Sequence, residues 1–185
     1  IGIAEMCQAL FGKNHAEDPE VHAFALKVVK RINEYAKEAS ERHDLNFSCY
    51  ATPAEGLCHT ALKGLRKQYG IIPNVTDKEF LTNSHHVPVW QEVGIFEKLA
   101  IEAPFCKYPT GGCITYVELD STFVKNKKAI EQIIDYAFKE LDIPYELCHT
   151  QVWRSYCKVK GKSRTDKKRS MQMIAKEWFD ITVSN

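Results

Sequence analysis

A short segment beginning at Thr52 has the residue types of an anion-binding site. It follows a stretch that alternates polar and apolar residues, as half-buried strands do, and precedes apolar residues at helical spacing. Thr52, Pro53 and Glu55 suit the N-cap, the first helical position and the third helical position of a capping box. The first N–H groups of a helix and its dipole attract anions, and Gly56 would let a phosphate approach the backbone. The segment therefore predicts either a phosphate site or an ordinary cap whose amides Thr52 and Glu55 satisfy.

The residue types that most often bind metals are scattered along the chain. His85 and His86 are adjacent, and neighbours in an extended segment point to opposite sides. We therefore do not expect both histidines to bind the same metal ion. The seven cysteines include no Cys-x-x-Cys pair and are Cys7, Cys49, Cys58, Cys106, Cys113, Cys148 and Cys157. Without a signal peptide, they are typical of reduced intracellular thiols, most of them small core residues. Cys148, His149 and Cys157 together give only a weak zinc signal.

Length and composition are those of one globular domain with a core. The chain has 185 residues, of which 44% are hydrophobic and 26% charged. No apolar run approaches the ~20 residues needed to span a membrane, so we expect a cytoplasmic protein with no membrane partner. Residues 151–185 carry nine basic and three acidic residues, a net charge of +6, which leaves −5 for residues 1–150. The chain begins with Ile1 rather than Met, which suggests a piece of a longer chain.

Predicted strands and helices alternate along the first 150 residues and would position the segment at Thr52. Helical patterns cover residues 4–11, a long stretch from Pro19, residues 53–69, 76–79, 94–102 and 125–141, while 166–179 form a possible amphipathic helix. Strands or extended pieces are expected at 46–51, 70–75, 87–89, 113–119 and 144–148. The long helix has a stripe that we expect to be buried, made of Val21, Phe24, Ala25, Val28, Ile32, Tyr35 and Ala39. This order of elements indicates an α/β fold with crossover helices.

Several of these segments occur together in one known family. In chain order they are residues 1–5 (IGIAE), 46–48 (NFS), 51–57 (ATPAEGL), 76–79 (TDKE), 82–87 (TNSHHV), 96–99 (FEKL), 111–118 (GGCITYVE) and the helix at 126–136. Over about residues 1–144 the chain resembles the anaerobic (class III) ribonucleoside-triphosphate reductases, which are glycyl-radical enzymes. The ordered series is far more specific than any one motif.

The resemblance implies both a fold and a reaction. Residues 1–150 would form part of the ten-stranded α/β barrel of this family, followed by a divergent basic tail at 151–185. The family converts ribonucleoside triphosphates to deoxyribonucleoside triphosphates with a glycyl radical and a thiyl cysteine, and it has a zinc site in its C-terminal region. The thiyl loop precedes this segment in the family and the glycyl motif follows it, so we expect no catalytic residue here. Implied partners are the nucleotide substrate, a radical-SAM activating enzyme and a second copy in a homodimer.

The resemblance also assigns a substrate site. Related reductases bind the nucleotide phosphates at a helix N-terminus after a barrel strand, which corresponds to residues 52–56. It gives Thr52 a hydroxyl contact or a cap, and gives Ala54, Glu55 and Gly56 backbone amides that bind phosphate. Asn83 and Ser84 are further candidates for the rim, and a turn with local side-chain hydrogen bonds is the alternative interpretation.

Two other hypotheses stay open. A degenerate reductase core without catalytic activity could carry a basic tail that binds nucleic acid or an acidic partner. Alternatively, the tail does not continue the body naturally, for example because of a frameshift.

Overall fold

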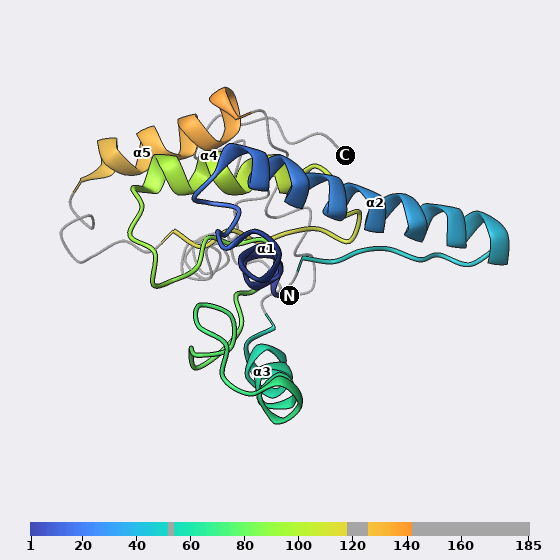
Figure 1. Cartoon of the computed structure of the whole chain (residues 1–185). Helices are drawn as coiled ribbons and strands as arrows, with labels where there is room; N and C mark the ends of the chain where they lie inside the picture. Colours follow the sequence, from blue (N-terminus) through green and yellow to red (C-terminus); the bar gives the residue numbers. More distant parts are fainter. Residues whose placement is uncertain (52–53, 118–125, 142–185) are drawn as a thin grey trace, which may run out of the picture. The chain divides into compact units, whose positions relative to one another are not determined.

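A computed structural model of the chain describes residues 1–51, 54–117 and 126–141, which all belong to the first of its two units, Ile1–Ile143. The described residues form five α-helices and one short π-helix (Figure 1). These are α1 (Ile3–Phe11), α2 (Pro19–His43), α3 (Glu55–Tyr69), α4 (Ile95–Cys106), α5 (Lys127–Asp135) and the π-helix η2 (Tyr136–Glu140). The strand expected at 144–148 and the helix expected at 166–179 lie in the second unit, outside the described residues.

The predicted start of α2 is confirmed. Asp18 is the N-cap, and its Oδ1 accepts hydrogen bonds from the N–H groups of Glu20 (2.9 Å) and Val21 (3.4 Å). Pro19, at the first helical position, has no N–H group that would need a partner. The cap therefore satisfies amides that the helix itself leaves free.

The main hydrophobic core lies where α1, α2 and α4 pack together. Its buried members are Cys7, Val21, Ala25, Val29 and Phe105. Phe105 is fully buried, and the rings of His15 and His22 meet it edge-on, with centroids 5.4 and 5.0 Å away. Because Phe105 lies in the last turn of α4, this core fixes the end of that helix.

A smaller core holds α3 against the loop that follows it. Cys58 and Leu62 of α3 pack against Leu81. The next residue, Thr82, is fixed to α1, because a carboxylate oxygen of the buried Glu5 accepts from its N–H and from its hydroxyl, both at 2.7 Å. These contacts set the position of residues 83–86, which lead into the candidate site.

The expected barrel is not observed, because the described residues contain no strand and no sheet. The two segments expected to be its clearest strands meet only at a parallel bridge between Ala51 and Cys113. Around it, Ala51 N–H donates to the carbonyl of Gly112 (3.0 Å) and Gly111 N–H donates to the carbonyl of Cys49 (2.8 Å). A strand needs a neighbour's backbone along its whole length, and the described residues supply one at this bridge only. The prediction of a partial ten-stranded α/β barrel is therefore wrong for this structure, which is helical.

The brief helix expected at 76–79 is also absent, and those residues form turns and bends. The side chain of Thr76 does not cap a helix there. Its hydroxyl instead accepts from the N–H of Ile72 (2.7 Å) and donates to the carbonyl of Gly70 (2.9 Å). Local side-chain bonding to the backbone thus replaces the predicted helix.

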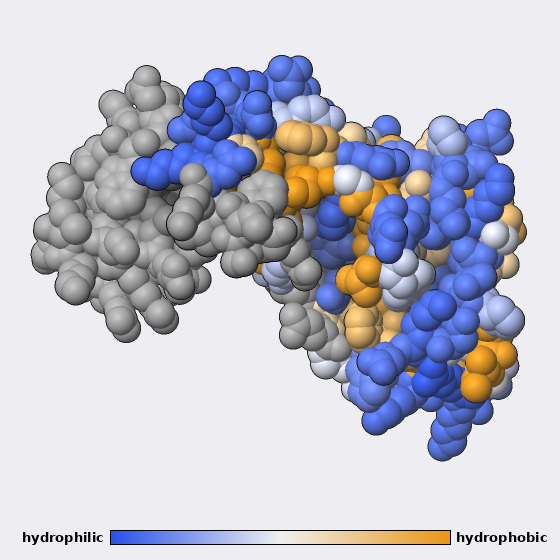
Figure 2. All heavy atoms as spheres, turned by 90° about the vertical axis from the view of Figure 1, so that its left-hand side faces the viewer, coloured by the Kyte–Doolittle hydropathy of each residue, from blue (hydrophilic) through white to orange (hydrophobic). Residues whose placement is uncertain are grey.

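The buried stripe predicted for α2 is only half correct. Val21 and Ala25 are buried, but Ile32 is 51% and Tyr35 57% exposed. In Figure 1, α2 extends well past the helices that cover its first half. Figure 2 shows another face of the molecule, on which hydrophobic residues lie open between hydrophilic ones. None of the described helices is both long and apolar enough to cross a membrane.

Candidate functional site

A cavity of about 730 Å³ opens between α3, the loop after it and α4. Most of its lining is apolar or aromatic, including Phe80, Trp90 and Tyr116. The polar side chains that line it are Cys58, Thr82, Asn83, His86, Gln91 and Lys98. Small-molecule sites have this size and this combination of an apolar wall with a few placed polar groups.

Asn83 connects the cavity to the N-terminus of α3. Its Oδ1 accepts a hydrogen bond from the N–H of Ala54, the N-cap residue of α3, at 2.8 Å. The same oxygen accepts from the thiol of Cys58 at 3.0 Å, and burial raises the pKa of that thiol, which keeps its proton in place. Because the oxygen of the amide faces the helix, the NH₂ group is the part of Asn83 that remains as a donor.

A buried carboxylate organises the opposite wall of the cavity. Glu102 is fully buried, and its carboxylate contacts Lys98 Nζ (2.7 Å), His86 Nδ1 (3.1 Å) and the N–H of Val87 (2.9 Å). Burial alone would raise the pKa of Glu102, but the hydrogen bond and charge of His86, together with Lys98, outweigh it and lower the pKa to about 2. Lys98 also donates to the carbonyl of Tyr116 (2.9 Å), so the described contacts use two of the three donors of its ammonium group.

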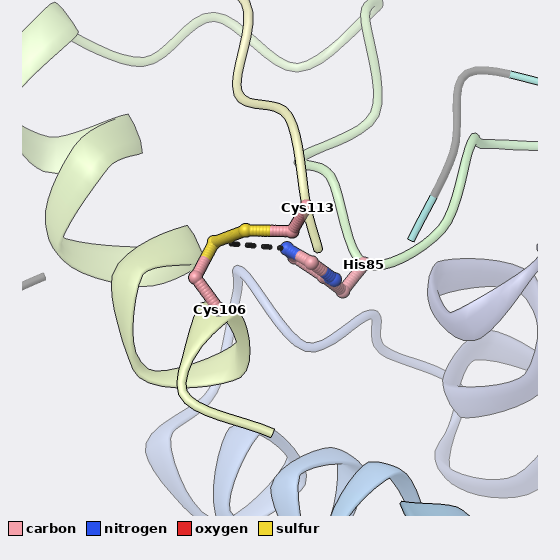
Figure 3. A group of neighbouring side chains, drawn as sticks. All are labelled: His85, Cys106 and Cys113. Carbon is pink, nitrogen blue, oxygen red and sulfur yellow. Dashed lines mark hydrogen bonds between the residues drawn. A yellow bond between two sulfur atoms is a disulfide. The ribbon is translucent and has the colours of Figure 1, made fainter. Parts of the chain in front are cut away.

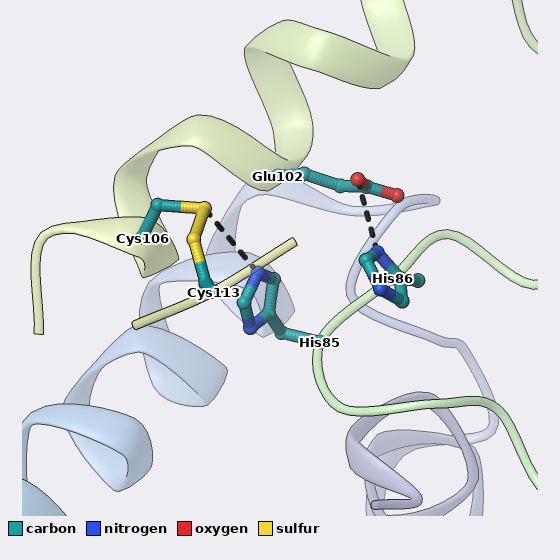
Figure 4. Close-up of a disulfide and its surroundings, with 5 residues drawn as sticks. All are labelled: His85, His86, Glu102, Cys106 and Cys113. Carbon is teal, nitrogen blue, oxygen red and sulfur yellow. Dashed lines mark hydrogen bonds and ion pairs between the residues drawn. A yellow bond between two sulfur atoms is a disulfide. The ribbon is translucent and has the colours of Figure 1, made fainter. Parts of the chain in front are cut away.

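The two adjacent histidines have different partners, although His85 lies in a turn and not in the extended segment on which the prediction was based. In Figure 4 the ring of His86 faces Glu102, whereas the ring of His85 faces Cys106 and Cys113. His86 Nε2 is buried and has no hydrogen-bond partner among the described residues. Burial, with a smaller effect from the charge of His86, lowers the pKa of His85 to about 4, so its imidazole is neutral at pH 7.

Cys106 and Cys113 form a disulfide, and His85 Nε2–H donates to Cys106 Sγ at 3.6 Å (Figure 3). The expectation that every cysteine is a free thiol is therefore wrong for this pair. A turn closed by a hydrogen bond from Gly112 N–H to the carbonyl of Pro109 (3.0 Å) reverses the chain and brings the two Cα atoms to 5.7 Å. The expectation of small core residues is confirmed for Cys7 and Cys58, which are buried free thiols, whereas Cys148 and Cys157 lie outside the described residues.

The structure brings together two of the predicted phosphate-site residues, Ala54 and Asn83. The amide of Ala54 is satisfied by the Asn83 side chain. Ser84 is buried with φ 43°, in a turn where His86 N–H donates to the carbonyl of Asn83 (3.0 Å). The alternative interpretation of residues 83 and 84 as a turn thus holds for the backbone, while the Asn83 side chain also lines the cavity.

Two further predicted site residues, Glu55 and Gly56, are at the start of α3. Gly56 is exposed in the first turn, and open space surrounds the position that a Cβ would take. The helix begins at Glu55 rather than at Pro53, two residues later than predicted. Thr52 lies outside the described residues, so its predicted role stays a prediction.

Sequence reasoning did not find Lys98, Glu102 or the disulfide. Lys98 and Glu102 have the i, i+4 spacing of helical ion pairs, which was an available signal. The predicted helix ended at residue 102, however, whereas α4 continues through Pro104 to Cys106. That extra turn is what brings Cys106 next to the Gly-Gly turn and Cys113.

Comparison with known proteins places the chain in a family. The family model of the anaerobic ribonucleoside-triphosphate reductases matches residues 1–172. The chain belongs to this reductase family. The match extends beyond residue 144, where the sequence analysis ended the resemblance, and includes most of the basic tail.

Individual reductases agree with this assignment. The chain is 34% identical to the anaerobic ribonucleoside-triphosphate reductase of Escherichia coli K12 over 157 residues, which are 84% of this chain and 22% of that protein. It is 40% identical to the phage T4 reductase over 129 residues, 67% of this chain and 21% of that protein. The Haemophilus influenzae reductase is 32% identical over 157 residues. The chain thus spans about a fifth of the length of these reductases.

Proposed function

We propose that this chain is part of an anaerobic ribonucleoside-triphosphate reductase and supplies elements that bind the substrate phosphates. The observation that carries the proposal is a single cavity lined by Asn83, which reaches the start of α3, and by the cationic Lys98. A helix N-terminus and an ammonium group are both attractive to phosphate oxygens. The apolar walls suit the uncharged part of a nucleotide.

The polar groups leave room for such a ligand. The described contacts of the Asn83 side chain involve only its oxygen, and those of Lys98 use two of its three donors. His86 Nε2, on the same cavity, has no partner among the described residues. A triphosphate with sugar hydroxyls offers acceptors for the first two groups, and a sugar hydroxyl can either accept from the imidazole nitrogen or donate to it.

In this proposal the chemistry belongs to the complete enzyme, which converts ribonucleoside triphosphates to deoxyribonucleoside triphosphates. The sequence has no counterpart of the family's Arg-x-x-Gly-Tyr glycyl motif or of its Cys-x-x-Cys zinc pairs. The residues of this chain would bind and orient substrate, while the glycyl radical, the zinc site, the activating enzyme and a homodimer are properties of the intact reductase.

Binding of nucleotides to the 185-residue chain tests the proposal. Each ribonucleoside triphosphate is compared with its nucleoside by isothermal titration calorimetry, and inorganic triphosphate is added as a competitor. We expect the triphosphates to bind more tightly than the nucleosides, and Lys98→Met to weaken their binding by at least about tenfold, because one charge-assisted hydrogen bond is lost.

Lys30→Met is the matched control, since Lys30 also forms an i, i+4 ion pair with a glutamate but lies on the exposed face of α2. It should leave the affinity unchanged. Equal affinity for triphosphate and nucleoside, or equal losses in the two variants, would refute the proposed phosphate site.

A further inference from the structure

His85, Cys106 and Cys113 bring three metal-binding side chains together from three separate segments. His85 lies in the turn after Thr82, Cys106 ends α4, and Cys113 follows the Gly-Gly turn. The ligand atoms of all three lie within 4.8 Å of one another. Figure 3 shows the imidazole directed at the two sulfur atoms.

The distance between His85 Nε2 and Cys106 Sγ matches that expected in a tetrahedral zinc site. With Zn–S near 2.3 Å and Zn–N near 2.05 Å, a sulfur and a nitrogen ligand of one tetrahedral ion lie about 3.6 Å apart, and two sulfur ligands about 3.8 Å apart. Cys106 Sγ and His85 Nε2 are 3.6 Å apart. One edge of the coordination polyhedron is thus already in place, and reduction of the disulfide frees the second sulfur to complete the set.

The surroundings of His85 hold its ring in this direction. The imidazole stacks on Phe105, with the ring centroids 5.1 Å apart and the planes at 11°. The backbone carbonyl of His85 accepts a hydrogen bond from Nε2 of the buried His15 at 2.9 Å. Ligands fixed by packing and by outer hydrogen bonds lose little freedom when a metal binds.

We propose that the reduced chain binds one Zn²⁺ ion through His85 Nε2, Cys106 Sγ and Cys113 Sγ. Three protein ligands leave the fourth tetrahedral position to water or to another ligand. Both cysteines are half-buried, so the ion reaches them from solvent. This site is separate from the proposed phosphate site, and neither proposal depends on the other.

The zinc site and the disulfide exclude each other, because the metal needs two thiolates. A water-soluble phosphine converts the disulfide to two thiols and is itself oxidised to the phosphine oxide with oxygen from water. Zinc binding then releases the two thiol protons to solvent, and the proton on His85 Nε2 is exchanged through solvent for one on Nδ1, so that the neutral ring binds the metal through Nε2. The oxidised chain should therefore bind no zinc at this site.

The first experiment measures metal binding to the full 185-residue chain, reduced with the phosphine and kept under nitrogen. We expect one Zn²⁺ per chain after dialysis. Co²⁺ in its place should give the absorption bands of a thiolate-ligated tetrahedral ion. The chain oxidised with oxidised glutathione should show neither.

Cysteine variants identify the ligands. Cys106→Ser and Cys113→Ser should each weaken zinc binding by more than about 100-fold, since even outer-sphere changes cost 10–100-fold. Cys49→Ser is the matched control, because Cys49 is also a half-buried cysteine but is a free thiol outside the cluster. Cys148→Ser and Cys157→Ser test the residues with the weak zinc signal, and loss of zinc in these variants with retention in Cys106→Ser would overturn the proposal.

A protection measurement on the unchanged sequence keeps the test independent of how the variants fold. Zn²⁺ should slow alkylation of Cys106 and Cys113 by iodoacetamide, as mapped by mass spectrometry, and should leave the rate at Cys49 the same. Equal alkylation rates at the first two residues with and without zinc would show that they do not bind the metal.

Discussion

The core around Phe105 and the bridge at Ala51 obtain their backbone hydrogen bonds from different sources. The helices of the core satisfy their own N–H and C=O groups four residues apart and pack through side chains alone. At the bridge, the N–H groups of Ala51 and Gly111 need carbonyls of the opposite segment. Phe105 is fully buried, whereas Phe47, in the segment before the bridge, is 44% exposed. A helix therefore makes its backbone hydrogen bonds without a neighbouring segment, whereas a strand needs a continuous neighbour.

The largest expected difference between the two regions is the effect of removing a phenyl ring. Phe105→Ala should lower the free energy of unfolding by about 3–5 kcal/mol, because it leaves a cavity in the main core. Phe47→Ala removes the same group from a half-exposed position and should cost less than about 1 kcal/mol. Urea unfolding followed by circular dichroism measures the free energy of unfolding of both variants. Similar losses in the two variants would contradict the predicted difference between the core and the segment before the bridge.

Lowering the pH should destabilise the helical core. Burial, with a further effect of the charge of His22, lowers the pKa of His15 from 6.5 to about 4, although its hydrogen bond to His85 opposes this. Between pH 6.5 and 4 the unfolded chain therefore binds a proton that the folded chain does not. Stability should be complete above pH 6.5 and fall as the pH drops towards 4, by up to roughly 3 kcal/mol from His15. The pKa of His85 is also lowered to about 4, so His85 should add a loss in the same pH range. Glu102, with its pKa lowered from 4.5 to about 2, should add a second loss below pH 4.5.

Unfolding measured from pH 7.5 to 4 checks this prediction. His15→Gln replaces the titrating ring with a side chain that still carries a donor, so its stability should depend less steeply on pH. An unchanged slope would mean that His15 is not responsible.

At the bridge, Gly111→Ala should be the most disruptive small change. An added Cβ would lie 2.8 Å from the carbonyl oxygen of Cys49 and 3.1 Å from Tyr50 Cβ, so the two segments would have to move apart. We expect a loss of about 1–3 kcal/mol. Gly64→Ala is the control in α3, where open space surrounds the new Cβ, and it should stabilise by about 0.5–1 kcal/mol. Thermal unfolding measures both variants. If both substitutions stabilise the protein, or both destabilise it, the predicted contrast between the bridge and the helix is wrong.

The smallest expected effect is at the start of α2. Asp18→Ala removes the acceptor for the N–H groups of Glu20 and Val21 and should cost about 1 kcal/mol. Asp18→Asn keeps the acceptor and should recover most of that loss. If the two variants are equally destabilised, the ion pair with Lys13 matters more than the cap.

The sequence predicted what depends on neighbours within one or two turns. The start of α2 at Pro19 and the end of α1 at Phe11, which Gly12 follows with a left-handed φ of 70°, are set by local chemistry. The bridge at Ala51 and the exposure of Ile32 depend on which distant segments are present, and periodicity alone contains no such information.

The same distinction holds for the candidate site. The turn at Asn83 was one of two interpretations of that segment, and the helix after it was predicted as far as residue 102, because both have local signals. The hydrogen bond from Ala54 to Asn83 spans 29 residues, and the contact of Glu102 with His86 spans 16. Such pairs form because the loop after α3 is fixed at two points, where Leu81 packs on α3 and where Glu102 of α4 binds the N–H of Val87. No local sequence pattern reveals these contacts.

The buried thiols provide separate measures of local opening in the two hydrophobic clusters. Cys7 lies in the core of α1, α2 and α4, and Cys58 lies in the small core of α3. Burial raises the pKa of both thiols, and only an exposed thiolate reacts readily with an alkylating reagent. Each labelling rate therefore reports how often its own cluster opens, with the half-buried Cys49 as a reference in the same sample. The native sequence thus allows the stability of α3 to be measured independently of the main core, without any introduced probe.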